Sequence, residues 1–212
     1  KTLAAQLCQE FREFFPNNAV HYFVSYYDYY QPEAYIQKTD TYIEKDSAIN
    51  DEIDRLRHAA TEALLTREDV IIVASVSCIY GIGNKEEYVG GILRLEKWQK
   101  YVMKDLINHL VGLQFDRAAT DFKQGMFRVL GDTLQIFPAS KEYYYSVEFF
   151  WTEIEAIRVV EPISWHVRES VPDLMLFPAS HTVTSVEHVK AITPIIKAEL
   201  AERMEYFKQT GN

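Results

Sequence analysis

The sequence predicts an α/β fold that carries a projecting β-hairpin and is followed by a small α+β unit. Apolar residues recur every three or four positions over Thr2–Phe15, as along one face of an amphipathic helix. The β-branched run Asp69–Val76 is typical of a parallel strand covered on both faces. Between these segments, Tyr22–Tyr42 holds seven of the fourteen tyrosines. Helix and strand signals on either side of an aromatic segment predict a layered domain with one extension.

The first elements alternate between helix and strand. Pro16 ends the first helix, and Ala19–Val24 is expected to be the strand that leads into the hairpin. Asn50 is a good N-cap for a second helix, which should end near Arg67, just before the β-branched strand. This order of elements predicts an α/β arrangement with a parallel sheet.

The hairpin is expected over residues 25–46, with its tip at Gln31–Asp40 and its return limb at Thr41–Lys45. Pro32 cannot donate a backbone hydrogen bond to a ladder, which favours its place in the tip. Strand alternation predicts two aromatic faces: Tyr26, Asp28 and Tyr30 on one, and Tyr27 and Tyr29 on the other.

Two interpretations of this segment stay open. It can be an edge strand packed under a neighbouring helix, or a projecting hairpin whose rings stack on nucleobases, at about 1–3 kcal/mol per base. The hairpin is locally acidic, so it does not suit a groove that follows phosphates. In the second interpretation it acts as a wedge among the bases. Its charged residues are Asp28, Glu33, Asp40, Glu44 and Asp46 against Lys38 and Lys45.

A smaller unit is expected after a glycine-rich boundary at Asn84–Gly91. Val102–Leu113 is periodic like a helix, and a second periodic stretch, Ser185–Phe207, should kink or restart at Pro194. Short strands joined by turns predict an antiparallel meander. The expected strands are Met126–Leu130, Thr133–Phe137, Tyr144–Phe150, Ile154–Val160 and Leu174–Phe177.

Composition narrows the classes of function. The chain has 212 residues, a formal net charge of −9 and 48% hydrophobic residues, so it can bury a core but is no basic nucleic-acid coat. Cys8 and Cys78 have no disulfide or zinc spacing, and no apolar run reaches the roughly 20 residues of a membrane helix. We therefore expect a cytoplasmic protein without a membrane partner. It starts inside a helix and without Met, and we expect it to be a fragment.

Three chemical sites are weighed and disfavoured. No GxxxxGK[ST] loop is present to hold nucleotide phosphates, and Gly81 and Gly83 are better explained as a turn than as a dinucleotide site. Cys78 with His58 as its base lacks an orienting third group, and a buried inert thiol is the simpler explanation. The third is a magnesium site among the acidic residues Glu44, Asp46, Asp51, Glu52 and Asp54. Helix-start electrostatics and a solvated face explain Asp51, Glu52 and Asp54 better.

Several stretches of the sequence closely resemble the UvrB family, a subunit family of the bacterial UvrABC excision nuclease. They are KTLAAQL, SYYDYYQPEAY, TYIEKDSAINDEIDRLRHAAT and DVIIVASVSCIYGIG, with GMFRVLGDTLQIFPAS, VEFF and LFPASH further on. The resemblance implies a partial helicase-like (RecA-like) domain over residues 1–86 with a hairpin that probes damaged DNA. It also implies a small UvrA-interaction domain over 87–181 and a return helix over 182–212. The implied process is nucleotide excision repair.

The resemblance also implies site residues. Tyr29 and Tyr30 would stack on bases, Tyr26 and Tyr27 would support the base of the hairpin, and Tyr35 and Tyr42 would flank its tip beside Glu33. Arg57 matches an arginine beside the DNA path, where a phosphate contact is its natural task. A solvated basic helix face is the alternative for Arg57 and its neighbours Arg55 and His58.

Docking on UvrA is implied for Arg117, Arg128 and Glu148. Strand alternation places Arg128 with Leu130 on one face, and Ser146 with Glu148. The chain departs from the family at several positions of this region. Leu130 and Ser146 replace usual arginines, Ala118 and Ala119 a usual Asn-Asp, Trp151 a usual glycine and Thr182 a usual aromatic residue.

The whole protein of such a family would bind ATP and magnesium and would meet UvrC, whereas this chain is expected to hold no cofactor and no metal and to lack ATPase activity. An alternative function is a pure protein-interaction module, as in the UvrB-homology region of transcription-repair coupling factors. A small hydrolase that uses Cys78 is a third.

Overall fold

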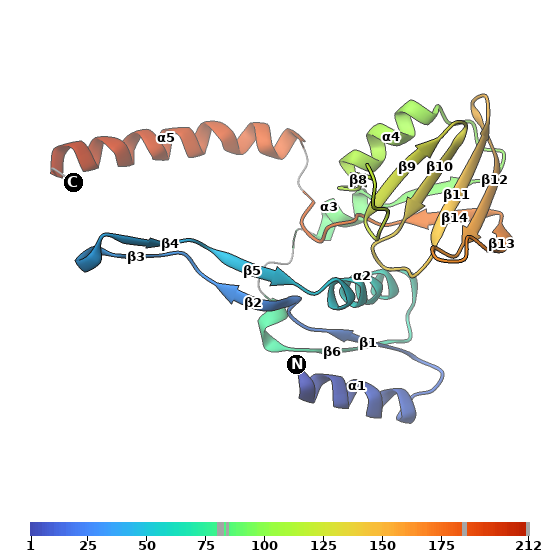
Figure 1. Cartoon of the computed structure of the whole chain (residues 1–212), viewed down its shortest axis with the longest axis horizontal. Coiled ribbons are helices and arrows are strands. Elements are labelled where there is room, and N and C mark those ends of the chain that lie inside the picture. Colours follow the sequence, from blue (N-terminus) through green and yellow to red (C-terminus); the bar gives the residue numbers. More distant parts are fainter. Residues whose placement is uncertain (80–82, 84, 184–185, 211–212) are drawn as a thin grey trace.

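The N-terminal unit is a two-stranded parallel sheet between two helices. The computed structural model describes residues 1–79, 83, 85–183 and 186–210. Strands β1 (Ala19–Phe23) and β6 (Val70–Ala74) pair in parallel, with Val20 opposite Ile71. Helices α1 (Thr2–Phe14) and α2 (Asp51–Thr66) cover the two sides of this sheet (Figure 1). The predicted order of elements and the parallel pairing are confirmed.

Alternation along the strands explains the two cores. Val20 and Val73 point towards α1 and pack on Cys8, which is 2% exposed. Phe23 belongs to the second cluster, which includes Ala60 of α2. Because successive side chains of a strand face opposite sides, two short strands serve both helices.

The hairpin is a long two-part ribbon that projects from this unit (Figure 1). Strands β2 (Tyr27–Gln31) and β5 (Asp46–Ile49) form the part near the root, and β3 (Ala34–Ile36) and β4 (Thr41–Ile43) form the outer part. A 3-10 turn at Gln37–Thr39 closes the ribbon. The predicted tip at Gln31–Asp40 is therefore too wide, and the return limb reaches Ile49. Pro32 interrupts the ladder, but pairing resumes beyond it.

A β-bulge changes which tyrosines share a face of the hairpin, so the predicted faces are wrong. Tyr27 pairs with Ile49 and Tyr29 with Ala48, so Asp28 is an extra residue without a cross-strand partner. An extra residue shifts the alternation by one position. The rings of Tyr27 and Tyr30 consequently meet, 5.4 Å apart between centroids, although simple alternation predicted opposite faces.

The C-terminal part contains a twisted six-stranded sheet with helix α4 (Met103–Gly112) beside it (Figure 1). The strand order is β13-β12-β11-β10-β9-β8, and a separate pair joins β7 (Leu93–Glu96) to β14 (Asp173–Leu176). The bounds of the sheet strands are Asp116–Arg117 (β8), Met126–Leu130 (β9), Thr133–Phe137 (β10), Tyr144–Phe150 (β11), Glu153–Val160 (β12) and Val167–Val171 (β13).

The predicted meander and its helix are confirmed, and its core contains Leu106, Leu134 and Ile157, each 1% exposed or less. Three strands were missed. β7 and β13 carry polar residues in alternation, and β8 is only two residues long. Short edge strands leave a weak pattern in a sequence.

The connection between the two units is partly helical. A 3-10 turn covers Val76–Ile79, and α3 (Lys85–Gly90) lies where a glycine-rich boundary was expected. The predicted boundary residue Asn84 and the turn residue Gly81 lie outside the described residues, as does Ser185, the expected start of the last helix.

Helix α5 (Val186–Thr210) is continuous through Pro194, so no new helix starts there. Its apolar side chains are exposed, including Ile196 and Leu200. Among the described residues, no helix combines the length and apolar character needed to cross a membrane.

Candidate functional site

Arg57 is the buried anchor at the root of the hairpin. Its side chain is only 4% exposed, and its Nη1 donates a hydrogen bond of 2.9 Å to the carbonyl oxygen of Val24. The guanidinium carbon lies 4.2 Å from the ring centroid of Phe23 and 5.0 Å from that of Tyr26. The interpretation of Arg57 as part of a solvated face is therefore wrong, because α2 turns its side chain inward beneath the hairpin. The phosphate contact that the resemblance implied for Arg57 stays a prediction.

A continuous stack of rings leads outward from Arg57. The rings of Tyr26 and Tyr27 are 4.5 Å apart, Tyr27 is followed by Tyr30, and Lys45 lies 5.7 Å from the Tyr30 ring. The hydrogen bond from Tyr26 to the Tyr27 hydroxyl, helped by burial, raises the pKa of Tyr26 to about 12. The inner rings are thus held by neighbours.

The outer tyrosines are open to solvent. The exposed fractions of Tyr29, Tyr30, Tyr35 and Tyr42 lie between 46% and 61%. Side chains with this exposure are not packed under a helix, so the interpretation as an edge strand under a helix is wrong for these four residues. The structure therefore presents free aromatic faces along the projecting arm.

Carboxylates hold the tyrosines near the tip. Tyr35 donates to Asp40 Oδ1 at 2.7 Å, and Tyr42 donates to Glu33 Oε2 at 3.2 Å. Each of these hydrogen bonds raises the pKa of its tyrosine. Tyr35 and Tyr42 are also cross-strand partners, so the two rings flank the outer ribbon together. Glu33 has a defined local role here, as the acceptor for Tyr42.

The predicted docking residues lie on the C-terminal sheet. Arg128 and Ser146 are both opposite Gln135, and Leu130 and Glu148 are both opposite Thr133. Directly opposed residues share a face, so these four positions form two adjacent rows on one face. Arg117 is exposed but pairs with Phe127, whose side chain is in the core, so its register does not place it in these rows.

Arg128 is held in an aromatic setting. Its Nε donates to Gln135 Oε1 at 2.7 Å, and its guanidinium carbon lies 4.4 Å from the Phe122 centroid. Arg128 and Phe122 line a pocket of about 340 Å³ that also includes Tyr144. An arginine that is already held in place loses less conformational entropy when it binds a partner.

Comparisons with known proteins bear on the whole chain. Residues 93–182 match the family model described as the UvrB interaction domain. The chain is 54% identical over all of its 212 residues to the UvrABC system protein B of Streptococcus suis, 55% to that of Streptococcus sanguinis and 53% to that of Lactococcus lactis. The chain belongs to the UvrB family. It spans 31–32% of the length of these UvrB relatives.

Two positions of the predicted docking face, Leu130 and Ser146, carry no arginine, and they differ in exposure. Leu130 is 52% exposed, so an arginine there would reach solvent, whereas Ser146 is 7% exposed and leaves little room. Glu148 accepts a hydrogen bond from Arg158, which neutralises part of its charge. Of the three predicted docking residues, Arg128 is the arginine that lies in these rows, and Leu130 is the position at which a missing arginine can be tested.

The contacts of Cys78, His58 and the acidic residues bear on the two chemical sites that the sequence disfavoured. Cys78 donates to the carbonyl oxygen of Phe23 at 3.2 Å, while His58 stacks on His181 at 4.0 Å, so no Cys-His pair forms. Glu52 binds Arg55, and Asp51 lies 3.9 Å from Lys123. Asp51 and Glu52 therefore each face a basic side chain, and Asp54 faces His58.

Asp54, His58 and His181 do come together, and their ligating atoms lie within 4.8 Å of one another. Burial, followed by the charge of Arg57, lowers the pKa of His181 to about 4, and burial also holds the pKa of His58 well below its usual range. The neutral rings suit a metal, but the neighbouring Arg57 charge repels a divalent cation. We assign this cluster to packing between α2 and the segment after β14.

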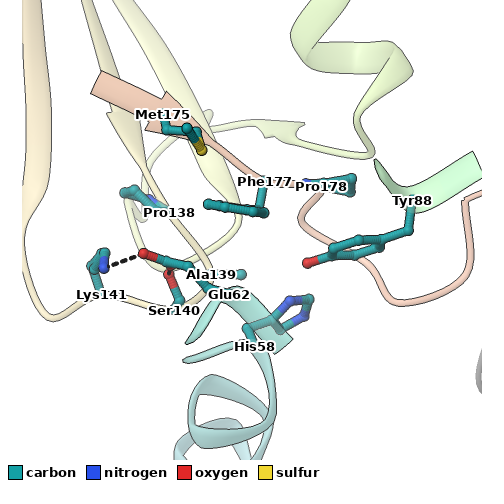
Figure 2. A pocket seen from close by; sticks show the side chains of 10 residues that line it. All are labelled: His58, Glu62, Tyr88, Pro138, Ala139, Ser140, Lys141, Met175, Phe177 and Pro178. Carbon is teal, nitrogen blue, oxygen red and sulfur yellow. Dashed lines mark hydrogen bonds and ion pairs between the residues drawn. The ribbon is translucent and has the colours of Figure 1, made fainter. Parts of the chain in front are cut away.

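Sequence reasoning missed the contact between α2 and the C-terminal part. Glu62 accepts hydrogen bonds of 2.5 Å from both Ser140 and Lys141 (Figure 2). Arg55 lies 3.1 Å from Glu142 and extends this contact along the helix. The sequence contains the charged face of α2 and, about 80 positions later, polar and charged residues that can pair with it. Only the fold brings the two together.

Proposed function

We propose that this chain is the DNA-engaging and partner-docking part of a UvrB protein in nucleotide excision repair. The exposed tyrosine arm carries this proposal. Rings that are half exposed, projecting and backed by a buried cation are suited to stacking on bases, because every base has a π-face. The acidic residues of the arm keep it from binding the phosphate backbone along its length.

In the proposed mechanism the arm enters damaged duplex DNA as a wedge. Tyr29 and Tyr30 stack on bases, while Tyr26 and Tyr27 support them from the root. Tyr35 and Tyr42 flank the end that passes furthest. A lesion is sensed because weakened stacking lets the wedge pass at a lower cost in unstacking energy. Arg57 supports the tyrosines from below.

The test compares Tyr30→Ala with Tyr30→Phe in the whole protein. Tyr30→Ala should weaken binding to damaged duplex by about 1–3 kcal/mol, the value of one stacked base. Tyr30→Phe keeps the ring and should bind like the parent. Melting should be unchanged in both. A strong loss of melting temperature with unaltered DNA binding would show that the rings are core and would contradict the wedge.

For the small domain we propose docking on UvrA through Arg128, with Arg117 and Glu148 at its margin. Arg128→Glu should weaken UvrA binding by roughly 2–5 kcal/mol, mostly because the opposing charge is stranded. Leu130→Arg should strengthen it, since position 130 is exposed on the same face. Undetectable binding that Leu130→Arg does not restore would leave the hairpin as the functional element.

ATP, magnesium and UvrC belong, in this proposal, to the rest of the protein. The phosphate-binding sequence GxxxxGK[ST] does not occur in this chain, and the residues present do not fit a nucleotide. A pure interaction module of the coupling-factor type is the second candidate. It would bind its partner normally and be indifferent to Tyr30→Ala.

A further inference from the structure

The bulged residue of the hairpin is tied directly to helix α2. Asp28 has no cross-strand partner, and its Oδ2 accepts a hydrogen bond of 2.9 Å from Asn50 Nδ2. Lys1 Nζ lies 3.7 Å from its other carboxylate oxygen. The unpaired position is therefore held by side chains in place of a ladder.

Asn50 uses both ends of its amide. Its Oδ1 accepts the backbone N–H of Ile53 at 3.0 Å and so caps α2, while its Nδ2 holds Asp28. Its own backbone N–H donates to the carbonyl oxygen of Tyr26 at 2.8 Å. Asn50 thus joins the start of the helix to the bulged residue Asp28 and to Tyr26, two positions before it.

The bulge decides which way Tyr30 faces. With Asp28 as an extra residue, the Tyr30 ring joins the stack that rests on Tyr27 and Tyr26. A regular ladder would place Tyr30 on the face opposite Tyr27. Bulges of this kind re-aim side chains, and they need outside contacts because one residue is unpaired.

We propose that Asn50 and Asp28 are positioning residues that fix the bulge and so aim Tyr30 for stacking. This inference rests on the proposed wedge function. The two residues touch no base themselves and act through the register of β2 on β5.

The chain offers a substitution that separates the link from the helix cap. Aspartate is as good an N-cap as asparagine, so Asn50→Asp keeps the cap of α2 but sets a carboxylate against Asp28. The double variant Asn50→Asp with Asp28→Asn exchanges donor and acceptor and restores the hydrogen bond. The two readouts are amide hydrogen exchange at Tyr29 and Tyr30, and binding of the whole protein to damaged duplex.

Asn50→Asp should speed exchange at these amides and weaken DNA binding about tenfold, as expected for one lost charge-assisted hydrogen bond. The double variant should recover both, and melting should stay close to that of the parent. Unchanged exchange in Asn50→Asp, or losses that the double variant does not recover, overturn the inference. If the wedge itself is wrong, Tyr30→Ala leaves DNA binding intact while the exchange readout still responds.

An independent observation concerns the tryptophans. All three lie at left-handed backbone positions, with φ of 70° at Trp98, 58° at Trp151 and 59° at Trp165. Each is at least 59% exposed. Only two other described non-glycine residues, Asp40 and Gln114, share this conformation. A bulky residue is an outlier there, and glycine is the residue that adopts it freely.

The chain has only eight glycines, whereas roughly 7% glycine is usual. We infer that these three turns are glycine turns, and that cells producing this protein decode the codon at these positions as glycine. UGA is a codon to which different genetic codes assign different residues. Peptide mass spectrometry of the protein purified from its own cells should find glycine at all three positions. Tryptophan in any of the three peptides, or UGG in the gene, overturns the inference.

Discussion

Lys141 donates a 2.5 Å hydrogen bond to Glu62, and the pair joins the C-terminal sheet to helix α2. Ser140 donates to the second oxygen of the same carboxylate. The side chain of Glu62 is only 17% exposed, and both of its oxygens accept hydrogen bonds from these partners (Figure 2).

Lys141→Ala should lower the free energy of unfolding by about 1–3 kcal/mol, because it leaves a largely buried carboxylate short of a donor. Lys123→Ala is the matched control. Lys123 meets Asp51 at 3.9 Å with both side chains mostly exposed, and such pairs contribute about 0–1 kcal/mol. Urea unfolding of both variants checks this. Equal losses would show that the Glu62 contact is unimportant.

Gly83→Ala should be strongly destabilising. A Cβ at position 83 would lie 2.3 Å from the backbone carbonyl oxygen of His181, and backbone cannot move aside as a side chain can. We expect a loss of about 1–3 kcal/mol. Gly90→Ala, in α3 with nothing within 4 Å, should instead be neutral or stabilising by about 0.4–1 kcal/mol. Thermal melting distinguishes the two, and a stable Gly83→Ala variant would refute the close approach.

Stability should fall as the pH drops below about 6.5, because His58 and His181 are neutral in the folded state. Burial lowers both pKa values, that of His181 to about 4, so the unfolded chain takes up protons first. The stabilisation by the neutral histidines is complete above pH 6.5, roughly the histidine pKa in the unfolded chain. It is lost as the pH falls from there towards the pKa of the folded state. Urea unfolding between pH 7.5 and 5.5, roughly the range before carboxylates titrate, measures the slope. His181→Asn should reduce the slope of the unfolding free energy against pH. An unchanged slope would contradict the assignment of this pH dependence to the buried histidines.

Trp151→Gly should stabilise the turn between β11 and β12. Trp151 is 87% exposed with φ 58°, and a left-handed L-residue costs roughly 1–2 kcal/mol. Trp151→Ala removes the ring but keeps the Cβ and its strain, so glycine should exceed alanine by about 1 kcal/mol in unfolding free energy. If the two variants are equally stable, the backbone at this turn is not strained.

Local patterns predicted most of the regular elements. The cap at Asn50, the strand pair β9 and β10 and the parallel partnership of β6 all follow from residue types and their periods. These features depend on a few neighbours in the sequence, which is why they can be read from it.

Features set by distant partners could not be predicted. The bulge at Asp28 depends on Asn50, which is 22 residues away. Arg57 lies in a basic stretch that suggested a surface, but Val24 and two aromatic rings provide a buried place for its charge. The density of tyrosines marked the hairpin in the sequence and the resemblance implied their individual roles, whereas the buried support beneath them could not be predicted.

Helix α2 contacts the root of the hairpin at one side and Ser140 and Lys141 at the other, so it links the arm to the C-terminal sheet. The extended part of the arm from Tyr27 to Ile36 has ten residues and, at roughly 3.3 Å per residue, is about 33 Å long. A tilt of about 6° at the root would therefore move the tip by about 3.5 Å, close to one base step along a strand. A small rotation of α2 against the C-terminal sheet would thus become, by leverage alone, a displacement on the scale of a nucleotide.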